Sequence, residues 1–370
     1  MPSTSLENWW QSAVTRPGVA RALLSAASLP YRAGLEANLA LYNWRLKART
    51  RPALPVLSVG NLSLGGAGKS TTVLFLARRL QALGVRPAVV TRGYRGHTAA
   101  AAVLISAGAE LLAGPEAGDE AAMLARLLPG VPVAVGKRRE RVLELLAAET
   151  DAQIVLLDDG FQYFRMERAF DLVLLDASRS TPRDRVFPGG WLREPWSHLR
   201  RASRVWLTHV DQATPEALAA LEALAERHTA LGPPVHTRHR LTVLHGPGGE
   251  RRTPESLAGQ RVLALSGLGN PESFETSLRA AGAEVLPCRF PDHHPYTPAD
   301  LLTISGQIKQ NHSNLLITTE KDAVKLARPG GGADPDPRSE LWVAECELEV
   351  LRGEDQVVAD LRLVAESLCI

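Results

Sequence analysis

The chain has 370 residues, with 42 lysines and arginines against 40 aspartates and glutamates. This length favours two domains, and the near balance of charge argues against nucleic acid or another polyanion as the partner. The cysteines Cys288, Cys346 and Cys369 are odd in number and scattered. We therefore expect a reducing compartment, with neither a disulfide framework nor a zinc site.

The first fifty residues form a basic segment with apolar stretches. Seven arginines and lysines but one acidic residue lie between Arg16 and Arg51, and Trp9 and Trp10 precede them. Such a segment can lie on an anionic membrane, or it can pack on the protein with its arginines in water. No apolar run approaches the roughly 18 to 20 residues of a membrane-spanning helix, and no signal-peptide pattern is found. We expect the protein to stay on the cytoplasmic side.

A phosphate-binding loop is predicted within "LSVGNLSLGGAGKSTTVLFLARRL", residues 57–80. A short apolar run before the glycines predicts a strand, and the helical periodicity after them predicts a helix. Glycine-rich backbone at a helix N-terminus can approach an oxyanion closely. The pattern G-x-x-x-x-G-K-[ST] is satisfied at Gly68, Lys69 and Ser70 but broken at Ser63, where its first glycine is expected. The loop is therefore a variant of the P-loop.

Strands and helices alternate from this loop to about residue 212. In "AQIVLLDDGFQ" an apolar run ends in Asp158 and Asp159, as in a Walker B strand, whose carboxylate holds Mg²⁺ directly or through water. "FDLVLLDAS" and "SRVWLTHVD" predict two further buried strands. The alternation predicts an α/β, P-loop NTPase-like fold with a doubly wound, mostly parallel sheet.

The segment from Arg179 to Arg204 is rich in arginine and carries Trp191 and Trp196. Arginine binds phosphate through two hydrogen bonds, and aromatic faces stack on sugars or lie at a membrane interface. The segment suits an anionic, partly apolar acceptor, although a solvated basic surface loop has the same composition.

A smaller second α/β domain is predicted beyond a Gly/Pro-rich junction. Within it, "PDHHPY" places His293 and His294 beside Asp292, where a carboxylate could orient an imidazole for proton transfer. A turn held by local hydrogen bonds is the other interpretation. Successive side chains of an extended segment point in opposite directions, so the two histidines are not equivalent.

The sequence of the phosphate loop helps to distinguish between classes of nucleotide-binding protein. "GGAGKST" is similar to the loop of ParA/MinD-like ATPases, but Leu64 stands where those proteins have a signature lysine. "TTEKD" has the letters of a guanine-binding motif at the wrong spacing. ATP is therefore the expected nucleotide.

Seven motifs occur in this order: "GNLSLGGAGKST", "TRGYRG", "GDE", "LLDDGFQ", "WLREP", "FPDHHPY" and "TTEKDAVKL". From about residue 40 to the C-terminus, the chain resembles the tetraacyldisaccharide 4'-kinase family, the lipid A 4'-kinases. The resemblance implies an amphipathic basic helical segment on the bilayer over 1–50, a P-loop kinase domain over 51–232 and a smaller C-terminal α/β domain over 233–370. A two-stranded linker is expected near residues 236–243 and 341–350.

The resemblance implies a kinase of lipid A biosynthesis. It would transfer the γ-phosphate of ATP, with Mg²⁺, to the 4'-hydroxyl of a tetraacyldisaccharide 1-phosphate at the cytoplasmic face of the inner membrane. The implied partners are this anionic glycolipid and the membrane surface, without nucleic acid, and we expect a monomer. Two alternatives remain: a ParA/MinD-like ATPase switch recruited to membranes, and a soluble P-loop kinase for a small metabolite.

The resemblance also implies roles for individual residues, in a reaction that depends on positioning and charge neutralisation. The ATP-binding residues are Gly65, Gly66, Ala67, Gly68, Lys69, Ser70 and Thr71, and the Mg²⁺ ligands are Ser70, Asp158 and Asp159. The catalytic residues are Asp119, His293, Lys69 and Arg193. Among them, Asp119 takes the proton of the acceptor hydroxyl and His293 assists it. The substrate-binding residues are Asn61, Arg193 and Glu194.

Two positions depart from the family pattern. Tyr163 follows "DDGFQ" where the family usually has histidine, and Trp191 stands in "PGGWLRE" where the family usually has proline. Both positions are expected near the acceptor, so they bear on its identity rather than on the reaction.

Overall fold

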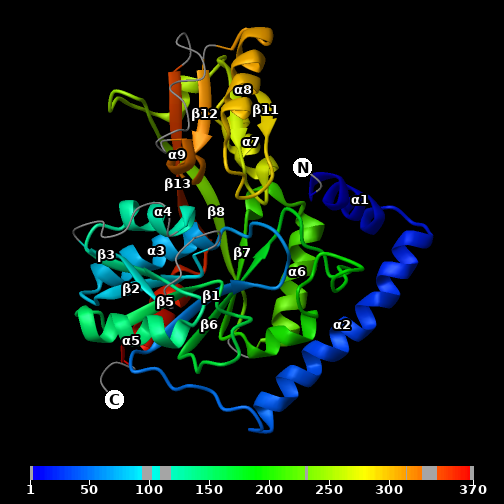
Figure 1. The fold of residues 1–370 in the computed structure, drawn as a ribbon, viewed down its shortest axis with the longest axis vertical. Helices are drawn as coiled ribbons and strands as arrows, with labels where there is room; N and C mark the ends of the chain where they lie inside the picture. Colours follow the sequence, from blue (N-terminus) through cyan, green and yellow to red (C-terminus); the bar gives the residue numbers. More distant parts are fainter. Residues whose placement is uncertain are drawn as a thin grey trace. The chain divides into compact units, whose positions relative to one another are not determined.

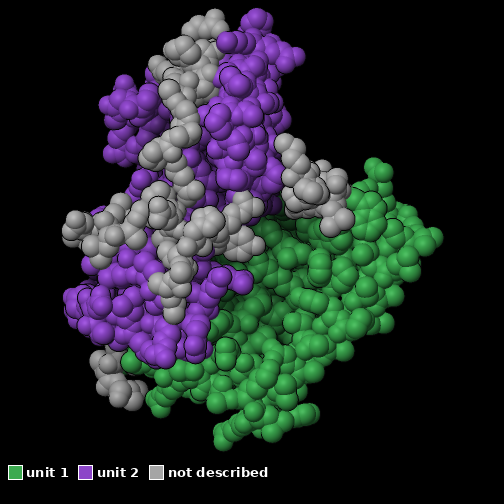
Figure 2. All heavy atoms as spheres, viewed as in Figure 1, with its two compact units in different colours: residues 1–69, 154–237, 350–370 green, residues 70–153, 238–349 purple. Residues whose placement is uncertain are grey.

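The computed structural model describes residues 3–93, 102–108, 118–229, 232–313, 315–326 and 340–366. Tyr94 to Gly96 of the motif "TRGYRG" lie outside the described residues. The strands are mostly parallel in a mixed α/β fold, which confirms the predicted fold class. The chain divides into two compact units, coloured separately in Figure 2. They are unit 1, residues 1–69, 154–237 and 350–370, and unit 2, residues 70–153 and 238–349.

The sheet of unit 1 is parallel throughout, in the strand order β8-β7-β6-β1-β5. Its strands are β1 (Val56–Asn61), β5 (Ile154–Asp158), β6 (Phe170–Asp176), β7 (Arg204–Thr208) and the start of β8 (Val235–His245). Every residue of the first four is buried, as expected of strands covered on both faces. Val59 lies opposite Asp158, so the phosphate loop after β1 and the carboxylates after β5 leave the sheet at the same edge.

The helices of unit 1 are α1 (Ser3–Thr15), α2 (Val19–Asn43), α6 (Pro215–His228) and α10 (Glu354–Glu366), with 3-10 helices over Trp196–Arg201 and Val210–Gln212. Figure 1 shows α2 as one long helix. Its C-terminal part buries Leu39 and Tyr42 in a cluster with Phe164. The predicted N-terminal segment therefore contains two helices, of which α2 packs on the core of unit 1.

Unit 2 contains two groups of strands. In the first, β11 (Glu284–Arg289), β10 (Arg261–Ser266), β12 (Leu315–Thr319) and β13 (Glu340–Arg352) are parallel neighbours in this order, and the short β9 (Arg251–Arg252) pairs with β8. The second group is β2 (Pro87–Thr91), β4 (Val131–Val135) and β3 (Val103–Gly108). The helices are α3 (Lys69–Ala82), whose first residue belongs to unit 1, α4 (Asp119–Leu127), α5 (Arg139–Glu149), α7 (Pro271–Ala280), α8 (Pro298–Gln310), α9 (Glu320–Leu326) and a 3-10 turn at Pro254–Leu257.

Two helices cover opposite faces of the first group of strands. α7 packs in a cluster with Val262 and Ala264 of β10. α8 packs in another cluster with Leu263 and Leu265 of the same strand. Since successive side chains of a strand point to opposite faces, the strands lie between the two helices. This part of the chain therefore has an α/β core of its own.

β3 is antiparallel to β4 and is not predicted from the sequence. The alanines that precede Val103 have low strand propensity and hide the short apolar run that follows them. The register also shifts between Leu104 and Ser106, so the alternation that marks a regular strand is interrupted.

Strands β8 and β13 occupy the positions where two linker strands are expected, and each contains residues of both units. Their role as a linker stays a prediction, as do the domain limits 1–50, 51–232 and 233–370.

Gly160, in the turn after β5, allows a close approach that a side chain would prevent. A Cβ atom there would lie 2.7 Å from both Leu157 Cδ2 and Ser58 Oγ. We expect Gly160→Ala to lower the free energy of unfolding by about 1 to 3 kcal/mol, measured by urea denaturation. Gly34→Ala is the control, because a Cβ atom at this helical position meets nothing within 4 Å. Equal midpoints for Gly160→Ala and the wild type would contradict this packing.

Candidate active site

The phosphate loop, residues 62–68, connects β1 to α3. Gly65 and Gly68 have φ angles of 101° and 79°, a region that is costly for residues with a side chain. Gly66 and Ala67 lie between them. The carbonyl of Ala67 accepts a hydrogen bond from Thr208 Oγ1 at 3.2 Å. This bond fixes the loop to the end of β7, a contact that the sequence does not indicate.

Lys69 begins the first turn of α3, followed by Ser70 and Thr71. Its Nζ lies 3.3 Å from Asn61 Oδ1 and 3.6 Å from Asp159 Oδ1. The amide hydrogens of a first helical turn have no partner within the helix and favour an anion. An ammonium group and helix N–H groups therefore meet at the end of the loop.

One carboxylate holds two cationic side chains in unit 1. Arg193 Nη1 donates to both oxygens of Asp159, at 2.9 and 3.1 Å, and Lys69 lies on the same carboxylate. We call Asn61, Lys69, Asp159 and Arg193 the Asp159 group. The structure thus brings together four predicted site residues from three separate segments of the sequence.

Asp158, the last residue of β5, is 1% exposed. Carboxylate and hydroxyl oxygens are hard ligands that suit Mg²⁺, which usually takes only one or two ligands from the protein. The donor atoms of Asp158 and Ser70 therefore fit the ion. Asp159 already pairs with Lys69 and Arg193, which favours Asp158 as the direct ligand. Within the described ranges, no three side chains of His, Cys, Asp or Glu gather as a metal site.

Glu194 is fully buried and has three polar partners. Its Oε1 accepts a hydrogen bond from Gln162 Nε2 at 2.9 Å, and its Oε2 lies 2.6 Å from both Arg201 Nη2 and His198 Nδ1. Burial alone would raise the pKa of Glu194, but the hydrogen bond from His198 and the charge of Arg201 outweigh it and lower the pKa below its usual value. The carboxylate is therefore ionised at neutral pH. Its assignment to the substrate stays a prediction.

Trp191 has a packing role in the structure. Its ring meets Trp10 of α1 edge-on, with centroids 4.9 Å apart. Trp10 also lies 5.7 Å from Phe187 and donates its indole N–H to the carbonyl of Pro188 at 2.8 Å. The departure from the family pattern at Trp191 is thus explained by contact with the N-terminal helix. Nothing in the structure explains the departure at Tyr163.

A second group of predicted residues lies in unit 2. Ser70 Oγ donates a hydrogen bond to Glu120 Oε1, which places the first turn of α3 beside the first turn of α4. Asp119 is the first residue of α4 and is 7% exposed. The charge of Glu120 acts on both His293 and Lys321. The motifs "GDE", "FPDHHPY" and "TTEKDAVKL" therefore converge.

The structure distinguishes the two histidines. Lys321 Nζ lies 2.8 Å from Asp292 Oδ1 and 3.4 Å from His293 Nε2. His294 Nε2 instead lies 2.9 Å from Asp300 Oδ2, in the capping box of α8. His293 is thus the imidazole that belongs to the converging motifs, whereas His294 stabilises a helix end.

Charges in this group are adjusted by burial and by neighbours. Burial, and next the ammonium group of Lys321, lower the pKa of His293, while the carboxylates of Asp292 and Glu120 act in the opposite direction. Burial alone would lower the pKa of Lys321, but Asp292 and Glu120 outweigh it and raise that pKa. At neutral pH, His293 is therefore a neutral imidazole beside a charged lysine.

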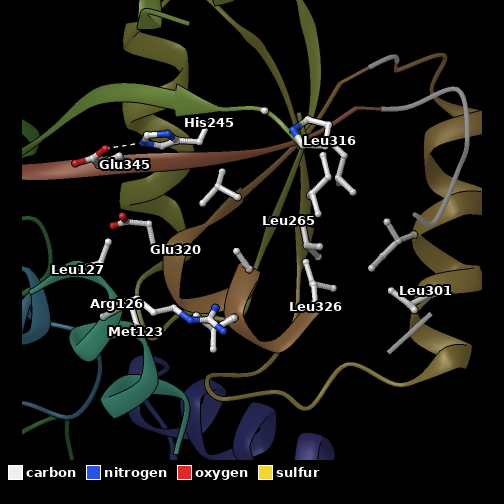
Figure 3. A pocket seen from close by; sticks show the side chains of 17 residues that line it. Met123, Arg126, Leu127, His245, Leu265, Leu301, Leu316, Glu320, Leu326 and Glu345 are labelled. Atoms are coloured by element: carbon white, nitrogen blue, oxygen red, sulfur yellow. Dashed lines mark hydrogen bonds and ion pairs between the residues drawn. The ribbon is translucent and has the colours of Figure 1, made fainter. Parts of the chain in front are cut away.

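Unit 2 also contains a cavity of about 600 Å³. Figure 3 shows His245, Glu345 and Glu320 on its left, with leucines from β10, β12 and α9 to their right. Burial, and next the charge of Glu345, raise the pKa of Glu320 to about 7. None of the predicted site residues lines this cavity. Its size therefore does not mark it as the reaction site.

Comparisons with known proteins agree with the motifs. The family model "Tetraacyldisaccharide-1-P 4'-kinase", LpxK, matches residues 20–365. The chain belongs to this family. A tetraacyldisaccharide 4'-kinase from Anaeromyxobacter dehalogenans (strain 2CP-C) is 42% identical over 95% of this chain and 93% of the relative. One from Syntrophus aciditrophicus (strain SB) is 38% identical over 82% of this chain and 84% of the relative.

A solved structure is also similar. The crystal structure of LpxK from Aquifex aeolicus in complex with ATP has a TM-score of 0.71 and 27% identity, and the alignment covers 93% of this chain and 99% of that one. This match supports the α/β fold of the family over nearly the whole chain.

Four residues at these groups are not assigned from the sequence. They are Glu120, Gln162, His198 and Lys321. Glu120, Gln162 and Lys321 lie within the motifs "GDE", "LLDDGFQ" and "TTEKDAVKL". Their positions therefore indicated a functional segment but not what each side chain does. His198 lies outside the motifs, four residues after Glu194, and its second partner, Glu36, is 162 positions away.

The contact between Lys321 and His293 predicts how the pKa of His293 responds to a substitution. We expect Lys321→Met to raise the pKa of His293, because the substitution removes a repelling charge and leaves Asp292 without its ammonium partner. Histidine NMR titration measures this shift directly. Lys309→Met, on the exposed side of α8, is the control and leaves the titration unchanged. An unshifted or lowered value in Lys321→Met would show that Lys321 does not govern this imidazole.

Proposed function

We propose that this chain is an ATP-dependent lipid kinase, which transfers the γ-phosphate to the 4'-hydroxyl of a tetraacyldisaccharide 1-phosphate in lipid A biosynthesis. The observation that carries the proposal is the family match over residues 20–365. The Asp159 group supports it, because two cationic side chains lie beside a phosphate loop. The ATP complex of the similar Aquifex aeolicus structure supports ATP as the phosphate donor.

The Asp159 group would act on the phosphates of ATP in two ways. Lys69 and the backbone amides of residues 65–70 would hold the β- and γ-phosphates, with Thr71 in the same helical turn, and Arg193 would neutralise the charge that develops during transfer. Asp159 keeps both cations in place before ATP arrives, so less side-chain ordering is needed on binding. Asp158, Ser70 and Asp159 are the residues that would hold Mg²⁺, which when bound neutralises the β- and γ-phosphate oxygens.

Asp119 would act as the general base. The acceptor hydroxyl must lose its proton as it attacks the γ-phosphate, and a carboxylate can accept that proton. His293 would assist, since a neutral imidazole can share a proton with a carboxylate. Asn61, Arg193 and Glu194 remain the residues proposed for the acceptor side.

A transfer assay tests the function and these roles. We expect the wild type to move labelled γ-phosphate from ATP to a tetraacyldisaccharide 1-phosphate in mixed micelles. Asp119→Asn should lower kcat by roughly 10²- to 10⁴-fold through loss of the base, and Lys69→Ala by roughly 10²- to 10³-fold through loss of phosphate stabilisation. Lys137→Ala, at an exposed position, is the charge control. ATP hydrolysis that needs no glycolipid, without transfer, would support an ATPase switch instead.

We also propose that the enzyme acts as a monomer bound peripherally to the cytoplasmic face of the inner membrane through α1 and α2. Seven of the twelve large apolar side chains that are exposed in the described residues lie between Trp9 and Leu46. Within α2, Val19, Leu23 and Leu29 are 66 to 78% exposed. Over the described residues, none of the helices combines the length and apolarity needed to cross a bilayer. Exposed apolar side chains beside arginines suit an interfacial position.

Vesicle binding tests the membrane contact. We expect the double variant Leu23→Asn with Leu29→Asn to bind anionic phospholipid vesicles at least about tenfold more weakly, because apolar area no longer enters the interface. Leu302→Asn with Leu363→Asn is the matched control, since these leucines are also exposed but lie on α8 and α10. Equal losses in both pairs, or in neither, would argue against α2 as the membrane contact. Sedimentation with vesicles measures the binding.

A further inference from the structure

A buried chain of polar side chains in unit 1 connects the segment after β5 with α2. Gln162 donates to the carbonyl of Asn61 and to Glu194 Oε1, each at 2.9 Å. Glu194 Oε2 lies 2.6 Å from His198 Nδ1, and His198 Nε2 lies 3.0 Å from Glu36 Oε1 on α2. His198 and Glu194 are both fully buried, whereas Glu36, at the α2 end of the chain of contacts, is partly exposed.

Both ring nitrogens of His198 face carboxylates. Each of its ring nitrogens lies within hydrogen-bond distance of a carboxylate, and an ionised carboxylate can only accept. When both carboxylates are ionised, both ring nitrogens are placed to donate, which is the hydrogen-bond pattern of an imidazolium. Arg201 supplies a second positive charge on the same oxygen of Glu194. With an imidazolium at His198, the charges of Glu36, Glu194, His198 and Arg201 sum to zero, which favours the burial of Glu194 and His198.

The surrounding elements contribute other charged and titratable groups. The hydroxyl of Tyr31 on α2 donates to the carbonyl of Arg193 at 3.2 Å. Burial, and next the charge of Glu194, raise the pKa of this hydroxyl, so it stays protonated. The charges of Arg168 and Asp171, which pair with each other at 2.6 Å, reach Arg201. Because this outer pair is itself neutral, it leaves the balance around His198 unchanged.

The contact between Glu36 and His198 joins α2 to the segment that follows Arg193. Between Arg16 and Arg51, Glu36 is the one acidic residue. Near it, Ser28 Oγ donates to the carbonyl of Val186 at 2.8 Å and accepts from the amide of Gly189 at 2.9 Å. These two hydrogen bonds hold α2 against residues 186–189, which precede Arg193 in the chain. Through His198, Glu36 also connects α2 to Glu194, the neighbour of Arg193 in the chain.

We propose that His198 is a positioning residue that links the docking of α2 to the placement of Arg193 in the Asp159 group. The kinetic part of this inference rests on the proposed kinase function. When α2 is in place, Glu36 completes the charge balance around His198, and Glu194 is held against Gln162 and Arg201. When the link is removed, Arg193 loses part of its support while the phosphate loop itself is unchanged. Glycolipid turnover then falls and ATP binding does not.

The first experiment needs no kinase activity. In protein labelled with ¹⁵N-histidine, both ring nitrogens of His198 should give the chemical shifts of protonated nitrogens at neutral pH, with the signals assigned from their loss in His198→Gln. Glu36→Gln should remove the proton from Nε2, because no carboxylate then requires it. Glu222→Gln, which removes the partner of His236, is the control and should leave the His198 signals in place. A single protonated nitrogen in the wild type would overturn the proposal, whatever the enzyme phosphorylates.

The second experiment is a double-mutant cycle in the transfer assay. Glu36→Gln and His198→Gln should each lower kcat/KM for the glycolipid by roughly 5- to 50-fold, and the double variant should lose no more than the worse single variant, since both changes break one link. KM for ATP should stay at the wild-type value. Additive losses, or an equal rise in KM for ATP, would overturn the linkage. Glu36 is partly exposed, so Glu36→Gln is expected to fold and decides the question if His198→Gln does not.

Discussion

The carboxylate of Asp159 is the interaction on which the rest of the site depends. Lys69, at the start of α3, and Arg193, far along the chain, lie 3.6 and 2.9 Å from this carboxylate. Without an anion between them, these two cations would repel each other. Asp159 holds both, with a φ angle of 52° that is uncommon outside glycine. The turn after β5 is thus shaped to present this carboxylate to the phosphate loop.

In both groups of site residues, a charged side chain stays ionised despite burial. Glu194 and Lys321 are ionised although burial opposes their charge, and in each case a specific partner outweighs that opposition. Removing one member of a buried pair typically costs about 3 to 5 kcal/mol, because the other charge is left uncompensated. Each group therefore contains fixed charges that depend on one another, which suits phosphoryl transfer by preorganised electrostatics.

The sequence predicts what is local and leaves out what depends on folding. Lys69, Asp158 and Asp159 follow from short motifs at strand ends, and the parallel sheet follows from buried apolar runs. The link from Glu36 to His198 joins residues 162 positions apart, and no spacing encodes it. His293 and His294 are adjacent in the sequence, yet their side chains have different partners. The backbone at His293, with a φ angle of 58°, accompanies this difference, and the sequence does not indicate it. The strand β3 is missed because alanines hide it.

The contact between Trp10 and Trp191 has a consequence for spectroscopy. Two indole rings at 4.9 Å in an edge-on arrangement are close enough for their electronic transitions to couple, and Phe187 restricts the motion of Trp10. A coupled and immobile pair absorbs left- and right-handed circularly polarised light unequally in the near ultraviolet. The attachment of α1 to the segment before Arg193 therefore carries its own optical signature, which exists without any added label.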